Sequence, residues 1–259
     1  MQFIDIHCHP NFPQYDEDRA EILAKMKTEK ILGICVGADF KTSKESVKLS
    51  EKEEHIYSSI GLHPTHWQDG FDEDEYQKLI TPKTVAVGEC GLDYFRRDAG
   101  EDEKIQQEKI LRKQIEFSIK NNLPLMIHCR PSSGEMDAYE DLIPILKCYE
   151  GKTFGNIHIF VGNKDIAKEL LALGFTMSFT AVVTFSNDYD EVIKFLPTDK
   201  IMSETDSPYV APVSIRGKRN DPTYVKEVVA RIAAIKGMPE KALSEAILEN
   251  ARRVFKLPI

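Results

Sequence analysis

Eight short apolar segments recur along the chain, and each is followed by at least one segment with helical periodicity. The apolar segments are rich in β-branched residues, which is typical of strands buried on both faces of a parallel sheet. They cover residues 3–7, 30–38, 56–64, 84–91, 124–129, 154–160, 175–179 and 201–206. The helical patterns cover residues 16–29, 40–53, 72–80, 102–121, 136–149, 163–173, 187–196, 222–236 and 239–255. This alternation predicts an α/β fold, and the count of eight predicts a closed (β/α)8 TIM barrel.

An open, doubly wound sheet is the alternative arrangement for the same alternation. Nothing in the sequence supports it, because no G-x-G-x-x-G follows the first apolar segment and no Walker-type G-x-x-x-x-G-K-[ST] occurs. No Ser/Gly/Pro-rich linker divides the chain, and 259 residues is a length that one α/β barrel reaches. We therefore expect a single barrel domain over residues 1–259. Within it, Thr42 followed by Glu45 predicts a capping box at the start of the helix over 40–53.

The chain carries an excess of acidic residues, with a formal net charge of −8 and a pI near 5.5. This charge argues against a protein that grips nucleic acid through a broad basic face. It does not exclude an enzyme whose metal ions and a few local cations meet the phosphates. The five cysteines include no C-x-x-C pair, and no segment approaches the ~20 apolar residues that span a membrane. With no signal-peptide pattern, we expect a cytoplasmic protein with free thiols, no membrane association and no obligate protein partner.

Histidines and carboxylates gather at the ends of the predicted strands. They are His7, His9, His63, His128 and His158, with Glu89, Asp93, Glu204 and Asp206. A single histidine in an apolar segment is more often a hydrogen-bonded core residue than a ligand. In a barrel, however, these strand ends surround one mouth, and so many buried groups without partners would be costly through desolvation and repulsion. A divalent metal removes that cost, since carboxylates and neutral imidazoles then become ligands.

The first strand constrains which of its side chains can serve as ligands. Residues i and i+2 of a strand point to one face, so His7 and His9 can meet one ion while Cys8 points to the opposite face. Asp5, on the same face as His7, is expected to hold an imidazole from behind. The six ligand candidates exceed the number that one catalytic zinc accepts, which favours two ions; they are His7, His9, Glu89, His128, His158 and Asp206. Glu89 could bridge the ions, and Asp206 could bind one of them and accept a proton from water.

Ordered motifs along nearly the whole chain carry a family resemblance. They are FIDIHCHPNF, GLHP (61–64), GECGLDY (88–94), PLMIHCR (124–130), IHIFVG (157–162), SETDSPYVAP (203–212), RGKRNDP (216–222) and NARRVFKL (250–257). With these motifs the chain resembles the TatD-like metal-dependent DNases of the amidohydrolase-type barrel superfamily. The resemblance implies a (β/α)8 barrel with a two-metal hydrolytic site. His7, His9 and Asp206 would hold the first ion, His128 and His158 the second, and Glu89 would bridge them.

Further roles follow from the same resemblance. His63 in GLHP would lie beside the metals and contact the scissile phosphate or the leaving group, and Arg130 matches an arginine of the family's fifth-strand motif. The sixth-strand motif departs from the usual H-C-F-[ST]-G, because Ile159 and Val161 replace a cysteine and a hydroxyl residue. The ligand position His158 is kept, so the departure bears on substrate range and metal preference.

We expect a metal-dependent hydrolase of ester bonds with two divalent ions (Zn, Mg or Mn) and with Asp206, Glu89 and His63 as catalytic residues. The predicted substrate is DNA, as a single strand or cleaved from its ends; the alternative is a carboxyl ester or amide, as in a D-aminoacyl-tRNA deacylase. Glu89 and Asp206 argue against a merely metal-binding or nucleic-acid-binding protein. The predicted substrate contacts are His63, Arg130, Arg216 and Arg219, with Arg96 and Arg97 as further cations. The candidates for stacking on bases are Trp67, Tyr94, Phe95 and Tyr209.

Overall fold

The computed structural model describes residues 2–95 and 100–258 and contains a sheet of eight strands in sequence order. Every neighbouring pair from the first strand to the last is parallel. The strands are β1 Phe3–Cys8, β2 Ile31–Val36, β3 Ile56–Ile60, β4 Thr84–Asp93, β5 Leu125–Arg130, β6 Gly155–His158, β7 Thr176–Phe179 and β8 Ile201–Ser203. Beyond the end of β8, the Asp206 amide donates to the His7 carbonyl (2.9 Å) and the His9 amide donates to the Ser207 carbonyl (2.8 Å). These bonds join the last strand's loop to the first strand, so the predicted (β/α)8 TIM barrel is confirmed.

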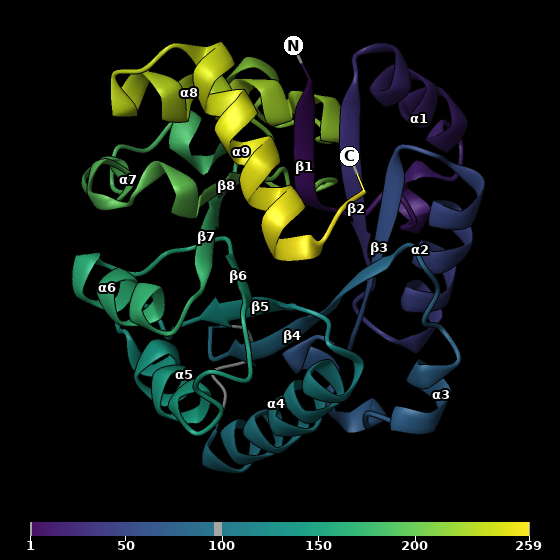
Figure 1. The fold of residues 1–259 in the computed structure, drawn as a ribbon, viewed down its shortest axis with the longest axis vertical. Coiled ribbons are helices and arrows are strands. Elements are labelled where there is room, and N and C mark those ends of the chain that lie inside the picture. Colours follow the sequence, from purple (N-terminus) through teal and green to yellow (C-terminus); the bar gives the residue numbers. More distant parts are fainter. Residues whose placement is uncertain (1, 96–99, 259) are drawn as a thin grey trace.

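Helices surround the sheet and follow one another around it in sequence order, from α1 to α8 (Figure 1). Their bounds are α1 Arg19–Thr28, α2 Phe40–Lys52, α3 Glu73–Gln77, α4 Glu101–Asn121, α5 Asp137–Lys147, α6 Lys164–Ala172, α7 Asp190–Phe195, α8 Val225–Lys236 and α9 Glu240–Phe255. All residues of β1, β2, β3 and β4 are buried, as expected for strands covered by helices on one face and by the barrel interior on the other. The continuous apolar pattern of these segments is therefore a consequence of burial on both faces.

The last helix, α9, lies across one end of the barrel rather than beside it (Figure 1). Its Ser244 hydroxyl donates to the Gln2 carbonyl (2.6 Å), and the Asn250 amide donates to the carbonyls of Thr198 and Ile201 (2.9 Å each). These carbonyls lie where β1 and β8 begin, so α9 covers the amino ends of the strands. The carboxyl ends of the strands, near the predicted ligands, lie at the opposite mouth of the barrel.

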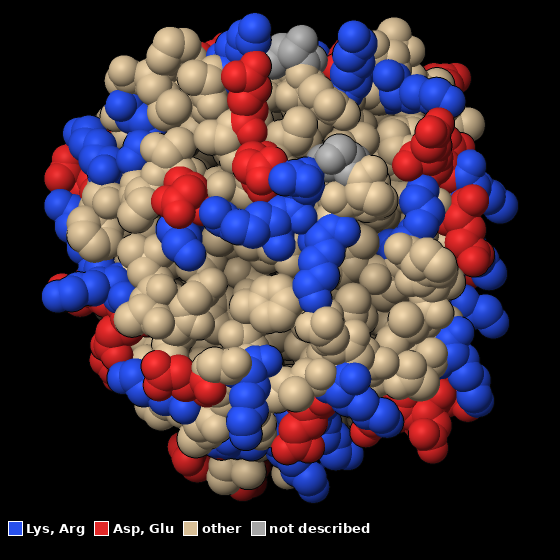
Figure 2. Space-filling model, viewed as in Figure 1, with Lys and Arg blue, Asp and Glu red and all other residues tan. Residues whose placement is uncertain are grey.

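Figure 2 shows the face that α9 covers, with basic and acidic side chains close to one another. On α9, the Nε of Arg252 lies 2.8 Å from Glu249, and Arg253 lies 3.9 Å from Asp199 in the turn before β8. The basic side chains of α9 are therefore paired and lie at the end of the barrel remote from the predicted ligands. None of the helices in the described part of the chain has the length and apolar character needed to cross a bilayer.

The start of α2 differs from the sequence prediction. The N-cap is Asp39, whose carboxylate accepts from the Thr42 amide (2.6 Å), while the Thr42 hydroxyl accepts from the Asp39 amide (2.9 Å). Thr42 therefore occupies the N3 position, the last of the capping box, and not the N-cap, its first. Glu45 pairs instead with Lys48 on the helix surface (2.7 Å). The prediction was wrong because both Asp39 and Thr42 satisfy the spacing of a capping pattern.

Replacing Asn250 with alanine should destabilise the barrel, because the carbonyls of Thr198 and Ile201 would lose their donor in a buried position. We expect the free energy of unfolding to fall by about 1–3 kcal/mol, the usual cost of unsatisfied buried polar groups. Urea denaturation followed by circular dichroism measures it. The exposed Glu245→Ala substitution on the same helix is the control and should stay within about 0.5 kcal/mol of the native chain. Equal effects of the two substitutions would contradict the anchoring role of Asn250.

Candidate metal centre

The six predicted metal ligands lie in the carboxyl-terminal halves of five strands or just beyond those strands. They come from β1 and the residue after it (His7, His9), β4 (Glu89), β5 (His128), β6 (His158) and the loop after β8 (Asp206). The pairing of β5 with β6 places His128 and His158 at the same register position. All are buried except Asp206, whose side chain is 14% exposed. The fold therefore brings together residues that are up to 199 positions apart in the sequence.

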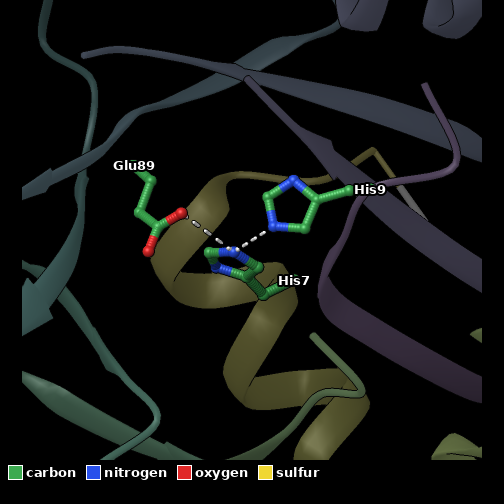
Figure 3. Close-up of side chains that lie close together, drawn as sticks. All are labelled: His7, His9 and Glu89. Atoms are coloured by element: carbon green, nitrogen blue, oxygen red, sulfur yellow. Dashed lines mark hydrogen bonds and ion pairs between the residues drawn. The ribbon is translucent and has the colours of Figure 1, made fainter. Parts of the chain in front are cut away.

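Glu89 occupies the middle of this group. Its Oε2 lies 3.6 Å from the Nε2 of His7 (Figure 3). Its Oε1 faces other histidines, at 2.8 Å from the Nδ1 of His128 and 3.6 Å from the Nε2 of His158. The two oxygens of one carboxylate therefore point toward two different sets of imidazoles.

His7 and His9 present their ring nitrogens to a common point. Their Nε2 atoms are 3.1 Å apart (Figure 3), and the Nε2 of His9 lies 3.3 Å from Asp206. The Nδ1 of His9 lies 2.9 Å from the carbonyl oxygen of Val36. Because a carbonyl can only accept, that nitrogen carries the proton and the Nε2 lone pair of His9 is left for a ligand. The Sγ of Cys8 lies 3.5 Å from the Ile34 carbonyl, between the first two strands.

The charges of the group suit a divalent cation. Burial and the neighbouring His158 lower the pKa of His7 to about 4, which leaves its imidazole neutral. Burial alone would raise the pKa of Glu89 and of Asp206. For Glu89 the surrounding imidazoles, His63 first, outweigh burial and hold the pKa well below its usual value, and for Asp206 His9 leads a smaller lowering. Neutral imidazoles and ionised carboxylates are the forms that bind metal, so His7, Glu89 and Asp206 are in the forms that fit a Zn²⁺-type or Mn²⁺-type ion.

His158 is held from behind by Glu204, a carboxylate at the end of the eighth predicted strand for which no role was predicted. The Oε2 of Glu204 lies 2.9 Å from the Nδ1 of His158 and accepts from the Ser178 hydroxyl (2.7 Å). Its Oε1 accepts from the Ile159 amide (2.7 Å). Burial lowers the pKa of His158, but Glu204, together with Glu89 and Asp206, outweighs it and raises that pKa to about 9, so a metal ion would bind this ring in place of a proton. Glu204 thus orients the ring and increases the electron density on its other nitrogen.

His128 has a similar support in Asp93. This residue lies at the end of the fourth predicted strand but is not one of the predicted site residues. The Nε2 of His128 lies 3.0 Å from Asp93, while its Nδ1 faces Glu89. Asp93 is four residues from Glu89 along β4, so the period of a strand puts both carboxylates on one face. Between them, position 91 must be glycine, because a Cβ atom there would lie 1.8 Å from the His128 carbonyl oxygen. The period of two was the signal that could have identified Asp93.

Asp5 does not hold an imidazole, which corrects the sequence prediction. Its Oδ1 accepts from the amides of Thr205 (3.0 Å) and His7 (3.2 Å), and its other oxygen accepts from the Thr205 hydroxyl. Thr205 precedes Asp206, which has a left-handed backbone with φ of 51°. Asp5 therefore fixes the main chain on both sides of the β1–β8 seam, next to a residue whose conformation is uncommon outside glycine.

His63 lies beside the predicted ligands with a defined arrangement of its ring nitrogens. The amide of Thr65 donates to its Nδ1 (3.2 Å), so in the neutral ring the proton is on Nε2. That Nε2 lies 3.5 Å from the Oε1 of Glu89. His63 consequently presents an N–H toward the centre and is suited to donate a hydrogen bond.

A cavity of about 740 Å³ opens over these residues. Arg130 lines it, whereas Arg216 and Arg219 do not. Arg219 instead pairs with Asp18 and packs over the ring of Tyr15, at 4.5 Å. Ile159 and Val161 both line the cavity, so the unusual sixth-strand motif changes its wall and not the ligand position at His158. The predicted cations Arg96 and Arg97 lie outside the described residues.

Comparison with known proteins gives consistent matches over the full barrel. A family model described as TatD related DNase matches residues 4–256. The uncharacterized metal-dependent hydrolase YabD of Bacillus subtilis (strain 168) is 38% identical over 260 residues, covering 98% of each chain. A 3′-5′ ssDNA/RNA exonuclease TatD from Pectobacterium carotovorum is 28% identical, covering 98% of this chain and 99% of its own. The crystal structure of YJJV, a TatD homologue from Escherichia coli K12, matches with a TM-score of 0.88 at 26% identity, covering 99% of this chain and 98% of that one.

Removal of divalent metal should lower the thermal stability of the protein, because the buried carboxylates would lose the cation that compensates them. At a free metal concentration a hundred times the Kd, binding stabilises the folded state by about 2.7 kcal/mol, which corresponds to a rise of roughly 5–10 °C in Tm for a chain of this size. Thermal denaturation after chelation and after resupply of Zn²⁺ or Mn²⁺ measures it. Glu89→Gln should lose most of this rise. An equal rise in this variant would show that the stabilising metal binds elsewhere.

Glu204→Gln should weaken metal binding at His158 without removing a ligand. The amide keeps the size of the side chain but replaces the charged acceptor beside the Nδ1 of His158, and such losses reduce metal affinity about 10- to 100-fold. Competitive titration with a metal chelator measures the affinity. Ser178→Ala removes another neighbour of Glu204 and keeps the carboxylate beside His158, so it should have a clearly smaller effect. The same loss in both variants would mean that the effect comes from general disturbance of the interior.

Proposed function

Because the chain belongs to the family of TatD-related DNases, we propose that it is a divalent-metal-dependent phosphodiesterase that cleaves single-stranded DNA, or DNA from its ends. The observation that carries this proposal is the position of Glu89, whose two oxygens face separate sets of histidines at the floor of the cavity. The relative named as an exonuclease for ssDNA and RNA supports the same class of substrate. The cavity volume falls within the range of about 300–1,000 Å³ for pockets that enclose small ligands. A chain terminus or a few nucleotides would fit there more readily than a duplex.

The proposed ligand sets correspond to the two carboxylate oxygens of Glu89. His7, His9 and Asp206 would hold one ion, His128 and His158 would hold a second, and Glu89 would contact both. Two such ions would supply an activated water and stabilise charge on the oxygens of the phosphodiester. In support, the ligand atoms of His7, His9 and Glu89 lie within 4.8 Å of one another, and so do those of Glu89, His128 and His158. Asp206 forms such a group with His7 and His158, so it lies between the two proposed sets.

Two side chains are suited to move protons in this reaction. Asp206 has an exposed edge and lines the cavity, so its carboxylate can accept a proton from the attacking water. His63 presents its Nε2–H toward the same space, so it can donate to a phosphate oxygen or to the leaving oxygen. Arg130 lines the wall of the cavity and adds a positive charge for the substrate backbone.

The test uses a single-stranded oligonucleotide labelled at either the 5′ or the 3′ end, incubated with the protein and Mg²⁺, Mn²⁺ or Zn²⁺. We expect metal-dependent shortening from one end, and a metal content near two ions per chain by elemental analysis. His63→Gln should lower kcat by about 10²–10⁴, the usual contribution of a positioned proton donor or acceptor, with the metal content unchanged. Activity equal to that of the native protein would remove His63 from the reaction.

The same water chemistry could serve a carboxyl ester, so D-aminoacyl-tRNA is assayed in parallel with DNA. Cleavage of the aminoacyl ester with no cleavage of DNA would replace the nuclease proposal by the deacylase alternative. A metal content of one ion per chain, after resupply, would overturn the two-ion arrangement and leave the hydrolase assignment in place.

A further inference from the structure

Two exposed phenylalanines near the mouth each carry an arginine on the ring. The guanidinium of Arg130 lies 4.0 Å from the ring centre of Phe95, and that of Arg216 lies 3.7 Å from the ring centre of Phe185. The rings are similarly exposed, at 45% for Phe95 and 40% for Phe185. The pairs differ in position, since Phe95 and Arg130 line the cavity over the metal centre and neither member of the other pair does.

The backbone at Phe95 is anchored to the metal centre. Its amide donates to the Oδ1 of Asp93 (3.1 Å), and the other carboxylate oxygen of Asp93 lies 3.0 Å from His128. Gln107 of α4 bonds both the amide and the carbonyl of Asp93 (2.8 and 3.0 Å). The adjacent Tyr94 is buried, with its hydroxyl 2.9 Å from Asp141. The backbone that carries this exposed ring is thus bonded to residues that contact the predicted ligands.

The other candidate aromatic residues are less suited to a ligand in the cavity. Tyr94 is only 2% exposed, and Trp67 packs against the core outside the cavity lining. Tyr209 lines the cavity and is 47% exposed. Phe95 differs from Tyr209 in having a cationic group stacked on its ring, which adds a positive charge where a phosphate would lie next to a base.

We propose that Phe95 and Arg130 form a nucleobase-stacking subsite, in which a base of the substrate stacks on the pair next to the scissile phosphodiester. The inference rests on the proposed nuclease function and adds how the strand is held. Every base has a π-face, so such a subsite favours a base over no base and does not select a sequence. Phe95 and Arg130 would act in substrate binding, and the proton transfers stay with Asp206 and His63.

The test compares oligonucleotides that carry either a normal base or an abasic tetrahydrofuran residue at one of the last three positions of the cleaved end. Stacking on an aromatic residue corresponds to a preference of about 5- to 150-fold for the base in kcat/KM. Phe95→Ala should reduce this preference to nearly one at one position, and Phe95→Trp should restore it. Phe185→Ala is the matched control, because it removes an Arg-stacked ring of similar exposure outside the cavity; it should keep the native preference.

A preference unchanged in Phe95→Ala, or lost equally in Phe185→Ala, would overturn the subsite. A second measurement separates this failure from failure of the proposed function. A cleavage-resistant phosphorothioate oligonucleotide with 2-aminopurine near its end is bound to the metal-loaded protein, and its fluorescence reports stacking. Quenching that Phe95→Ala abolishes supports the subsite even when no strand is cleaved. Equal quenching in both proteins contradicts it even when the native enzyme is an active nuclease.

Discussion

The buried negative charge of Glu89 is the constraint on which the arrangement of the mouth depends. A carboxylate removed from water is costly unless opposite charges or strong donors compensate it. Here the compensation comes from histidines on β1, β5 and β6 and after β3, which only a closed sheet of parallel strands brings to one place. The same histidines keep the pKa of Glu89 low, so the group that would bridge two cations is already in its ligand form. Fold and chemistry are therefore linked through one side chain.

Around this centre, further carboxylates hold the predicted ligands in place and are not predicted to bind the metal themselves. Glu204 holds the ring of His158, Asp93 holds that of His128, and Asp5 holds the main chain that leads to Asp206. Each of them is fully buried. At the other end of the barrel, α9 covers the amino ends of the strands through Ser244 and Asn250. The contacts of these buried carboxylates restrict the freedom of the predicted ligands, which favours binding because less motion is lost when an ion enters.

Sequence alone predicted the barrel and the gathering of the histidines, because both follow from periodicity. Parallel strands buried on both faces are continuous apolar segments, and their carboxyl ends share one mouth. The supporting roles were harder to predict. Glu204 and Asp206 have the same spacing from each other as His7 and His9, yet Glu204 contacts the Nδ1 of His158 whereas Asp206, which has a left-handed backbone, faces the Nε2 of His9. Arg219, a predicted substrate contact, pairs with Asp18, which is 201 positions away in the sequence. No local sequence pattern distinguishes an arginine in such an ion pair from one that binds a substrate phosphate.

The net charge of the chain bears on how a nucleic acid could be held. With a formal charge of −8, the chain as a whole does not attract a polyanion at long range. We therefore expect affinity to come from contacts made inside the cavity, where the cation on an aromatic ring and the proposed metal ions at the floor would act at short range. The two Arg–Phe pairs make the same point: their chemistry is alike, and only Phe95 and Arg130 line the space above Glu89. For the proposed binding of a base, the position of a side chain within the barrel therefore matters more than its residue type.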